Sequence, residues 1–149
     1  RSHVAFHGHD LDGTGLLFSG DTLFSLGCGR LFEGTPAQMH ASLQRLASLP
    51  GDTLVCCGHE YTMANAIFAT TVDPGNPALR ERAEAVRRLR DAGLPSLPVT
   101  LASERACNPF LRCDDPAVRA AVERHVGHAL DTAVDVFASL RHWKDGFRG

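Results

Sequence analysis

The stretch LLFSGDTLFSLGCGRLFEGT, residues 16–35, places a carboxylate directly after an apolar run. The run Leu16–Phe18 is followed by a Ser-Gly turn and then by Asp21, and the loop that follows carries glycines at 27, 29 and 34. Apolar residues bounded by turn signals predict a short buried strand. A carboxylate at the end of such a strand needs a cation or another partner, because a buried unpaired charge is unstable.

A second strand is expected to end in the same way. Thr53–Cys57 is apolar, and Gly58 and His59 follow it. Ligands gather beyond the carboxyl ends of strands in α/β sheets, and imidazole and carboxylate groups both bind divalent metals. Asp21 and His59 are therefore candidate metal ligands. Two ligands are fewer than the three of a catalytic zinc, so a turn cap at Asp21 and a core histidine at His59 stay open as alternatives.

The elements around these residues predict an α/β unit. His3–Phe6 and Gly15–Ser19 are expected to be strands joined by a turn at Asp12-Gly13. Thr35-Pro36-Ala37-Gln38 predicts a helix start with a capping box and proline at the first helical position. With the strand at 53–57, the order is strand, strand, helix, strand, which is typical of an α/β fold.

The composition changes after residue 62 and becomes mostly helical. Helices are expected at 63–72, 78–92, 116–126 and 131–143, and residues 94–110 are expected to be irregular because prolines interrupt them. A boundary is expected near residues 62–75.

Bulk composition excludes several classes of protein. The net charge of −2 provides no general basic surface for nucleic acid, and no apolar run approaches the roughly 20 residues of a membrane span. The cysteines at 28, 56, 57, 107 and 113 include no C-x-x-C pair. They predict reduced core thiols in a cytoplasmic protein rather than disulfides or a zinc knuckle.

Three further clusters could bind ligands. The glycine loop 27–35 does not match a nucleotide-binding motif, because G-x-G-x-x-G would need glycine at Phe32. Arg30 in this loop is either an anion clamp or a solvated side chain. His7–Asp12 contains metal-binding residue types, although a solvated turn explains them equally. Arg141 and Lys144 share a helix face and could hold a carboxylate with Tyr61, or they could complement the helix dipole.

Taken together, four segments resemble the hydroxyacylglutathione hydrolase (glyoxalase II) family of the metallo-β-lactamase-fold superfamily. They are SGDTLFSLGCGRLFEGT (19–35), TLVCCGHEYTMANAIFA (53–69), NPFLR (108–112) and RHWKDGF (141–147). The resemblance implies that residues 1–65 form the second half of an αββα metallo-β-lactamase sandwich. Residues 66–149 would form a small, mostly helical, glutathione-binding domain.

The resemblance also implies a site. Asp21 would bridge two divalent metal ions and His59 would bind one of them, and both would be catalytic. Zn²⁺ is the first expectation, with Fe or Mn as alternatives. Phe32 replaces a tyrosine and Arg30 a lysine of some relatives. The substrate-binding positions would be Arg30, Leu31, Phe32, His59, Glu60, Tyr61, Arg141, His142, Trp143 and Lys144.

The implied reaction is hydrolysis of S-D-lactoylglutathione to glutathione and D-lactate, the second step of methylglyoxal detoxification, by a monomeric enzyme with a metal-bridging hydroxide. The family's H-x-H-x-D-H metal motif is absent, and the spacing at 7–12 does not replace it. The chain also opens in strand-like sequence at Arg1, so we expect it to be the C-terminal part of a longer protein whose N-terminal half supplies the other ligands. The alternative is an inactive truncated fragment or pseudo-enzyme that retains only glutathione-binding residues.

Overall fold

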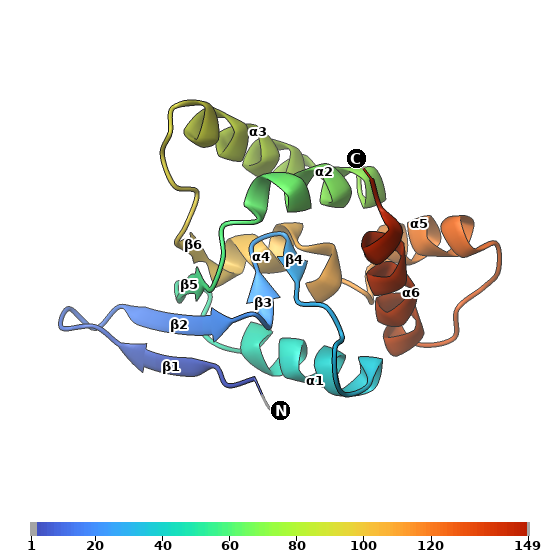
Figure 1. Cartoon of the computed structure of the whole chain (residues 1–149), viewed down its shortest axis with the longest axis horizontal. Helices are drawn as coiled ribbons and strands as arrows, with labels where there is room; N and C mark the ends of the chain where they lie inside the picture. Colours follow the sequence, from blue (N-terminus) through green and yellow to red (C-terminus); the bar gives the residue numbers. More distant parts are fainter. Residues whose placement is uncertain (1–2, 149) are drawn as a thin grey trace.

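The computed structural model describes residues 3–148, which form a mixed α/β structure built on one four-stranded sheet (Figure 1). The sheet order is β1 (Phe6–His9), β2 (Gly15–Gly20), β5 (Leu54–Cys57) and β6 (Val99–Thr100). β2 pairs in parallel with β5, and the two outer pairings are antiparallel. The carboxyl ends of β2 and β5 therefore meet at one edge of the sheet. A separate hairpin of β3 (Leu23–Phe24) and β4 (Gly27–Cys28) follows β2.

Helices supply most of the rest. Within residues 3–148 they are α1 (Pro36–Ala47), α2 (Thr62–Val72), α3 (Pro77–Asp91), α4 (Leu101–Cys107), α5 (Pro116–Val126), α6 (Ala133–Gly146) and the 3-10 helix η1 (Pro109–Leu111). In Figure 1, α1 lies below the β3–β4 hairpin, α2 and α3 lie above it, and α5 and α6 lie to one side. None of the helices in the described part of the chain has the length and apolar character needed to cross a bilayer.

Local sequence explains where several helices begin. Thr35 and Gln38 form the expected capping box at the start of α1, with Pro36 in its first turn. Thr132 and Asp135 form the same arrangement at α6. These signals are independent of the rest of the fold, because the bonds are made within one helical turn.

The inner face of the sheet belongs to a core that continues into the helices. Leu17 and Val55 are fully buried, as are Leu43 of α1, Phe68 of α2 and Phe137 of α6, and all belong to one cluster. The boundary expected between residues 65 and 66 lies inside α2. The division of the chain into two domains at that point stays a prediction.

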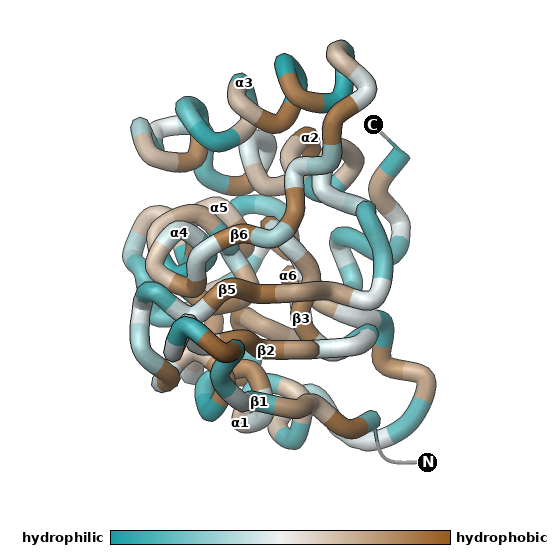
Figure 2. The backbone as a smooth tube through the Cα atoms, turned by 90° about the vertical axis from the view of Figure 1, so that its left-hand side faces the viewer, coloured by the Kyte–Doolittle hydropathy of each residue, from teal (hydrophilic) through white to brown (hydrophobic). Residues whose placement is uncertain are grey.

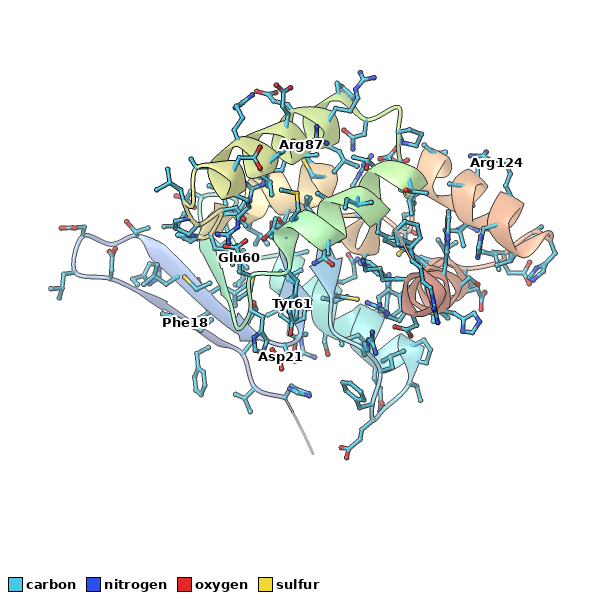
Figure 3. The ribbon with its side chains drawn as sticks, turned by 45° about the horizontal axis from the view of Figure 1, so that its top comes forward. Phe18, Asp21, Glu60, Tyr61, Arg87 and Arg124 are labelled. Carbon is cyan, nitrogen blue, oxygen red and sulfur yellow. The ribbon has the colours of Figure 1, made fainter. Side chains whose placement is uncertain are left out.

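The opposite face of the sheet is apolar and open. Phe6 and Phe18 are paired across β1 and β2, and they are 68% and 52% exposed; Val4, just before β1, is 61% exposed. Figure 3 shows the Phe18 side chain projecting from the hairpin, away from the helices. Side chains alternate between the faces of a strand, so the run Leu16-Leu17-Phe18 makes both faces of β2 apolar. A strand that is apolar on both faces is typical of a sheet covered on both sides. Figure 2 shows the apolar character of β2 and β5 along their length.

Three expectations about elements were wrong. The first strand is Phe6–His9 rather than 3–6, because the register with β2 pairs Phe6 with Phe18 and His9 with Gly15. His7 and His9 therefore lie in a strand, and the turn is confined to 10–14, where Asp10 Oδ1 accepts from the backbone N–H groups of Asp12 and Thr14.

The segment 94–110, expected to be irregular, contains β6, α4 and η1. The glycine loop begins with strand β4, which pairs with β3. Both errors concern elements that are short and that form through tertiary contacts, so local patterns carry little signal for them.

Candidate active site

Asp21 and His59 come from neighbouring strand ends. Because β2 and β5 run in parallel and Gly20 pairs with Cys57, the residues after these two strands lie at the same edge of the sheet. His59 Nε2 lies 3.5 Å from Asp21 Oδ1. The two side chains are 53% and 48% exposed, so both are open to a ligand. The backbone joins the strand ends as well, since the Gly58 N–H donates to the Gly20 carbonyl at 2.9 Å.

Neighbouring atoms leave no room for a side chain at Gly58 or Gly29. A Cβ on Gly58 would lie 2.8 Å from Asp21 Oδ1, and a Cβ on Gly29 would lie 2.0 Å from the Asp21 carbonyl oxygen. Both distances are shorter than a carbon–oxygen contact allows. Close packing of three backbone segments thus holds the carboxylate next to the imidazole.

The donor set at this edge suits a divalent metal but is incomplete. A carboxylate and an imidazole that face each other are two ligands of the kind that Zn²⁺, Fe and Mn accept. Residues 3–148 contain no group of three or more His, Cys, Asp or Glu side chains that could hold a metal ion. Asp21 and His59 could therefore supply two ligands to a metal ion, but they are not a complete set.

A pocket of about 470 Å³ extends from Asp21 and His59 to the end of α6. Aromatic rings and cationic side chains share its lining. The residues that line it are His3, Asp21, Phe24, Cys28, Gly29, Arg30, Phe32, Met39, His59, Tyr61, Ala64, Asn65, Arg141, Lys144, Asp145 and Phe147.

Aromatic rings form the wall beside His59. The Tyr61 ring stacks on the His59 ring with centroids 5.1 Å apart and planes inclined by 21°. Phe24 packs edge-on against Tyr61 at 5.1 Å. Figure 3 shows Tyr61 beside Asp21. Phe32 lies in the loop after β4 and is 81% exposed. A flat apolar wall of this kind can hold an extended ligand against the two polar residues.

Three cations gather at the other end of the pocket, and they differ in accessibility. The Arg30 side chain is 66% exposed, whereas that of Arg141 is 6% exposed. Arg141 donates to the Cys28 carbonyl at 2.8 Å and to Asp145 Oδ1 at 2.9 Å. Asp145 Oδ1 also lies 3.7 Å from Arg30 Nε. Arg141 thus joins α6 to the end of β4, while Arg30 remains open to an anionic ligand.

Lys144 is held over aromatic rings. Its Nζ lies 5.1 Å from the centroid of Phe68 and 5.7 Å from that of Phe147, and it donates to the Ala64 carbonyl at 3.4 Å. Burial lowers the pKa of Lys144, and the positive charges of Arg141 and Arg30 lower it further. A carboxylate bound here would restore the preference for the charged amine.

Four residues expected to bind substrate do not line this pocket: Leu31, Glu60, His142 and Trp143. Leu31 packs against the core, and Trp143 stacks on His125 with centroids 4.0 Å apart. His142 is exposed. On a helix, residues 141, 144 and 145 share one face, whereas residues 142 and 143 lie on another. This spacing explains why the first three line the pocket and the other two do not.

Glu60 is engaged by hydrogen bonds. It accepts from the Thr62 hydroxyl, from the Ser96 hydroxyl and from the Ser96 N–H. Burial alone would raise the pKa of Glu60, but the hydrogen bonds from Ser96 and Thr62 outweigh it and lower that pKa.

Asp145 and Phe24 are among the pocket residues that were not expected from the sequence. Asp145 could have been found, because it lies four residues after Arg141, the spacing of a helical ion pair. Phe24 gives no such signal, since its place depends on the β3–β4 hairpin.

The chain is similar to known proteins along almost its whole length. A family model described as "Hydroxyacylglutathione hydrolase C-terminus" matches residues 60–147, more than half of the chain. A protein of Xanthomonas campestris pv. campestris (strain B100) named hydroxyacylglutathione hydrolase is 61% identical over 148 residues, covering 99% of this chain and 56% of the relative. Proteins with the same name from Xanthomonas axonopodis pv. citri and Aeromonas hydrophila are 61% and 55% identical, with the same coverage. The chain spans about half the length of the curated relatives it matches. The chain therefore belongs to the hydroxyacylglutathione hydrolase family, whose C-terminal region its residues 60–147 match.

Proposed function

We propose that this chain contributes to a metal-dependent thioesterase that converts S-D-lactoylglutathione and water to glutathione and D-lactate. Family membership supports the reaction class. The observation that carries the proposal is that one pocket connects the Asp21–His59 pair to the cations Arg30 and Lys144. A thioester of an anionic tripeptide needs both a reaction centre and a cationic end.

In this proposal, Asp21 and His59 hold part of a dinuclear metal centre. Asp21 would bridge two divalent ions, and His59 would bind one of them; Zn²⁺ is the first choice, with Fe or Mn as alternatives. Bound divalent ions supply a water of lowered pKa and polarise the thioester carbonyl. The crowded backbone at Gly58 and Gly29 keeps the two ligands at a fixed separation.

The other pocket residues bind and orient the substrate. Arg30 and Lys144 would pair with the carboxylates of glutathione, and Arg141 would keep α6 against the Cys28 carbonyl so that Lys144 faces the pocket. Tyr61 and Phe24 would cover the acyl part and exclude bulk water. Positioning of this kind accelerates a reaction by fixing the distance between the reacting groups.

The open sheet face supports the proposal that residues 1–65 are half of an αββα metallo-β-lactamase sandwich. Phe6 and Phe18 form an apolar surface that a second sheet layer would cover. The relatives contain the additional length, since the match covers 56% of their sequence. The same part of the protein would bring the remaining metal ligands. We also place the protein in the cytoplasm, because all five cysteines are free.

The second candidate is a glutathione-binding chain without catalytic activity. The absence of a third metal ligand among residues 3–148 favours it for the 149-residue chain by itself. The two candidates differ in what they need: the enzyme needs further ligands, whereas the binding module needs only Arg30, Lys144 and Tyr61.

A chimaera tests the enzymatic proposal. The N-terminal part of the Xanthomonas campestris relative, joined to this chain at the aligned position, should bind metal and hydrolyse S-D-lactoylglutathione. Asp21→Asn and His59→Ala should each lower kcat at least about 100-fold and reduce the metal content, because each removes a direct ligand. His128→Ala, which changes an exposed histidine outside the pocket, should leave both unchanged.

Two results would contradict the proposal. One is a folded chimaera whose metal content and kcat do not depend on Asp21. The other is a chimaera without thioesterase activity that still binds glutathione, which would support the second candidate.

A further inference from the structure

Glu60 stands between two pocket residues, His59 and Tyr61, yet its carboxylate is bound elsewhere. Glu60 Oε1 accepts from the Ser96 hydroxyl at 2.5 Å and from the Thr62 hydroxyl at 2.7 Å, and Oε2 accepts from the Ser96 N–H at 3.1 Å. We propose that Glu60 is a positioning residue that holds His59 and Tyr61 by fastening the turn between β5 and α2 to the segment between α3 and β6. The inference rests on the proposed function, because it assigns His59 and Tyr61 their roles in the pocket.

The turn at 58–61 depends on this attachment because it has few other bonds. Residues 58–61 belong to no strand or helix. Tyr61 occupies the N-cap position of α2 but makes no side-chain capping bond. On the strand side, the Gly58 N–H bond to Gly20 fixes the first residue of the turn. The Glu60 carboxylate fixes the turn between His59 and Tyr61, where the two rings stack.

The attachment point is part of the packed interior. Ser96 is 4% exposed, and its carbonyl accepts from Arg82 Nη2 of α3 at 2.9 Å. The same Arg82 nitrogen lies 3.4 Å from the Ser25 hydroxyl, and Ser25 donates to the buried Glu104. Glu60 therefore connects the turn to a hydrogen-bonded chain that runs through α3 to the β3–β4 hairpin, the element that carries Phe24 of the aromatic wall.

This arrangement also explains why an acidic residue can stand between the proposed metal ligand His59 and Tyr61 of the aromatic wall. A carboxylate facing the pocket would compete with Asp21 for a cation and repel an anionic substrate. Both Glu60 oxygens are instead occupied by donors from Ser96 and Thr62. The side chain thus contributes rigidity without adding negative charge to the pocket.

The first test measures the position of the rings in the 149-residue chain without any metal. Nuclear Overhauser contacts between the His59 and Tyr61 rings should be present in the wild-type chain and weakened in Glu60→Gln, which replaces one of the two acceptor oxygens by an amide nitrogen that cannot accept. Ser96→Ala, a milder change that keeps the backbone bond, should weaken them less. Glu84→Gln on the exposed surface of α3 is the matched control and should leave the contacts unchanged.

The second test uses Zn²⁺ alone, titrated into the chimaera against a competing chelator. Glu60→Gln should weaken Zn²⁺ binding about tenfold, the usual effect of removing a residue that orients a metal ligand. If Glu60 acts through Ser96, Ser96→Ala should have little further effect in the Glu60→Gln background, and such a double-mutant cycle measures the coupling between the two residues.

The outcomes separate this inference from the proposed function. Zn²⁺ binding that depends on His59 but not on Glu60, together with unchanged ring contacts in Glu60→Gln, would overturn the positioning role and leave the metal centre intact. Zn²⁺ binding that does not depend on His59 would overturn the proposed function. If Glu60→Gln fails to fold, Ser96→Ala decides: unchanged ring contacts and unchanged Zn²⁺ affinity in that variant would contradict the inference.

Discussion

A buried acid, Glu104, controls the conformation of the hairpin that carries part of the aromatic wall. It is fully buried and accepts from the Ser25 hydroxyl, the Leu26 N–H and the Asn108 amide at 2.7, 2.9 and 2.9 Å. Burial raises the pKa of Glu104 more than these hydrogen bonds lower it. The bond to Leu26 holds that residue at a φ of 58°, a conformation that residues other than glycine rarely adopt.

Glu104→Ala should therefore lower the free energy of unfolding by about 3 kcal/mol, because buried donors of Leu26 and Asn108 lose their acceptor. Urea unfolding followed by circular dichroism measures this. Glu84→Ala, which removes the exposed Glu84–Arg88 pair, should change the free energy by less than about 0.5 kcal/mol. A loss at Glu104 as small as that of the control would show that the hairpin does not depend on the carboxylate.

The second prediction at this scale concerns the pH dependence of anion binding by Lys144. Its pKa is lowered by burial and by Arg141 and Arg30, so it loses its proton at a lower pH than an ordinary lysine. The affinity for an S-alkyl glutathione, whose thiol is blocked, should fall as the pH rises through this lowered pKa. In Lys144→Arg the fall contributed by this residue should disappear, because a guanidinium keeps its charge. Calorimetric titrations from neutral to alkaline pH measure both profiles, and identical profiles would show that Lys144 does not bind the anion.

At the scale of elements, parallel pairing of β2 with β5 creates the candidate site. Strands of four to six residues would place their end residues far apart in any other arrangement, whereas the parallel register puts Gly20 opposite Cys57. The helices contribute the cations and begin at well-defined caps. At α5, Asp115 accepts from the N–H groups of Ala117 and Val118, and it pairs with Arg112 at 2.7 Å.

This cap makes a prediction about stability and pH. Partial burial would raise the pKa of Asp115, but the Ala117 N–H and the Arg112 charge outweigh it and lower that pKa. A lowered folded-state pKa stabilises the fold above the unfolded-state pKa, and the contribution is lost as the pH falls through the folded-state value. Asp115→Ala should lower the free energy of unfolding by about 1 kcal/mol at neutral pH, and the difference from wild type should shrink in acid.

Urea unfolding of both proteins from pH 7 down to pH 3 measures this difference, with the exposed Asp52→Ala as the matched control. A difference that is constant over this range would show that the charge of Asp115 does not contribute to the cap.

At the scale of the whole molecule, the apolar sheet face is the feature that the described residues leave uncovered. Phe18 projects away from the helices (Figure 3), its cross-strand partner Phe6 shares its face, and Val4 is also exposed. Exposed apolar patches of this kind bind other apolar surfaces. The 149-residue chain should therefore self-associate at high concentration and bind an apolar fluorescent dye.

Phe18→Thr should lower the dye signal about twofold or more, because it removes a central part of the patch while keeping a strand-forming residue. Leu11→Thr removes an even more exposed apolar residue from the hairpin turn, away from the patch, and should have little effect. Dye titration and sedimentation velocity measure the two variants. Equal effects of Phe18→Thr and Leu11→Thr would contradict the idea of a continuous apolar face.

By itself, the sequence determined the local structure and the chemical character of the site. Capping residues predicted the start of α1, and the sequence pattern predicted α2, α3, α5 and α6. These features are readable because their interactions span only a few residues.

The tertiary structure alone decided where the predicted side chains point and which short elements form. The register with β2 placed the first strand at Phe6–His9, and contacts across the fold formed β3, β4, β6 and α4. The structure also turned Glu60 towards Ser96 and buried Arg141 against Cys28, while Arg30 stayed open to the pocket. Those placements depend on partners that are distant in the sequence: 36 positions separate Glu60 from Ser96, and 113 separate Cys28 from Arg141. A local pattern contains no information about which distant partner each side chain will meet.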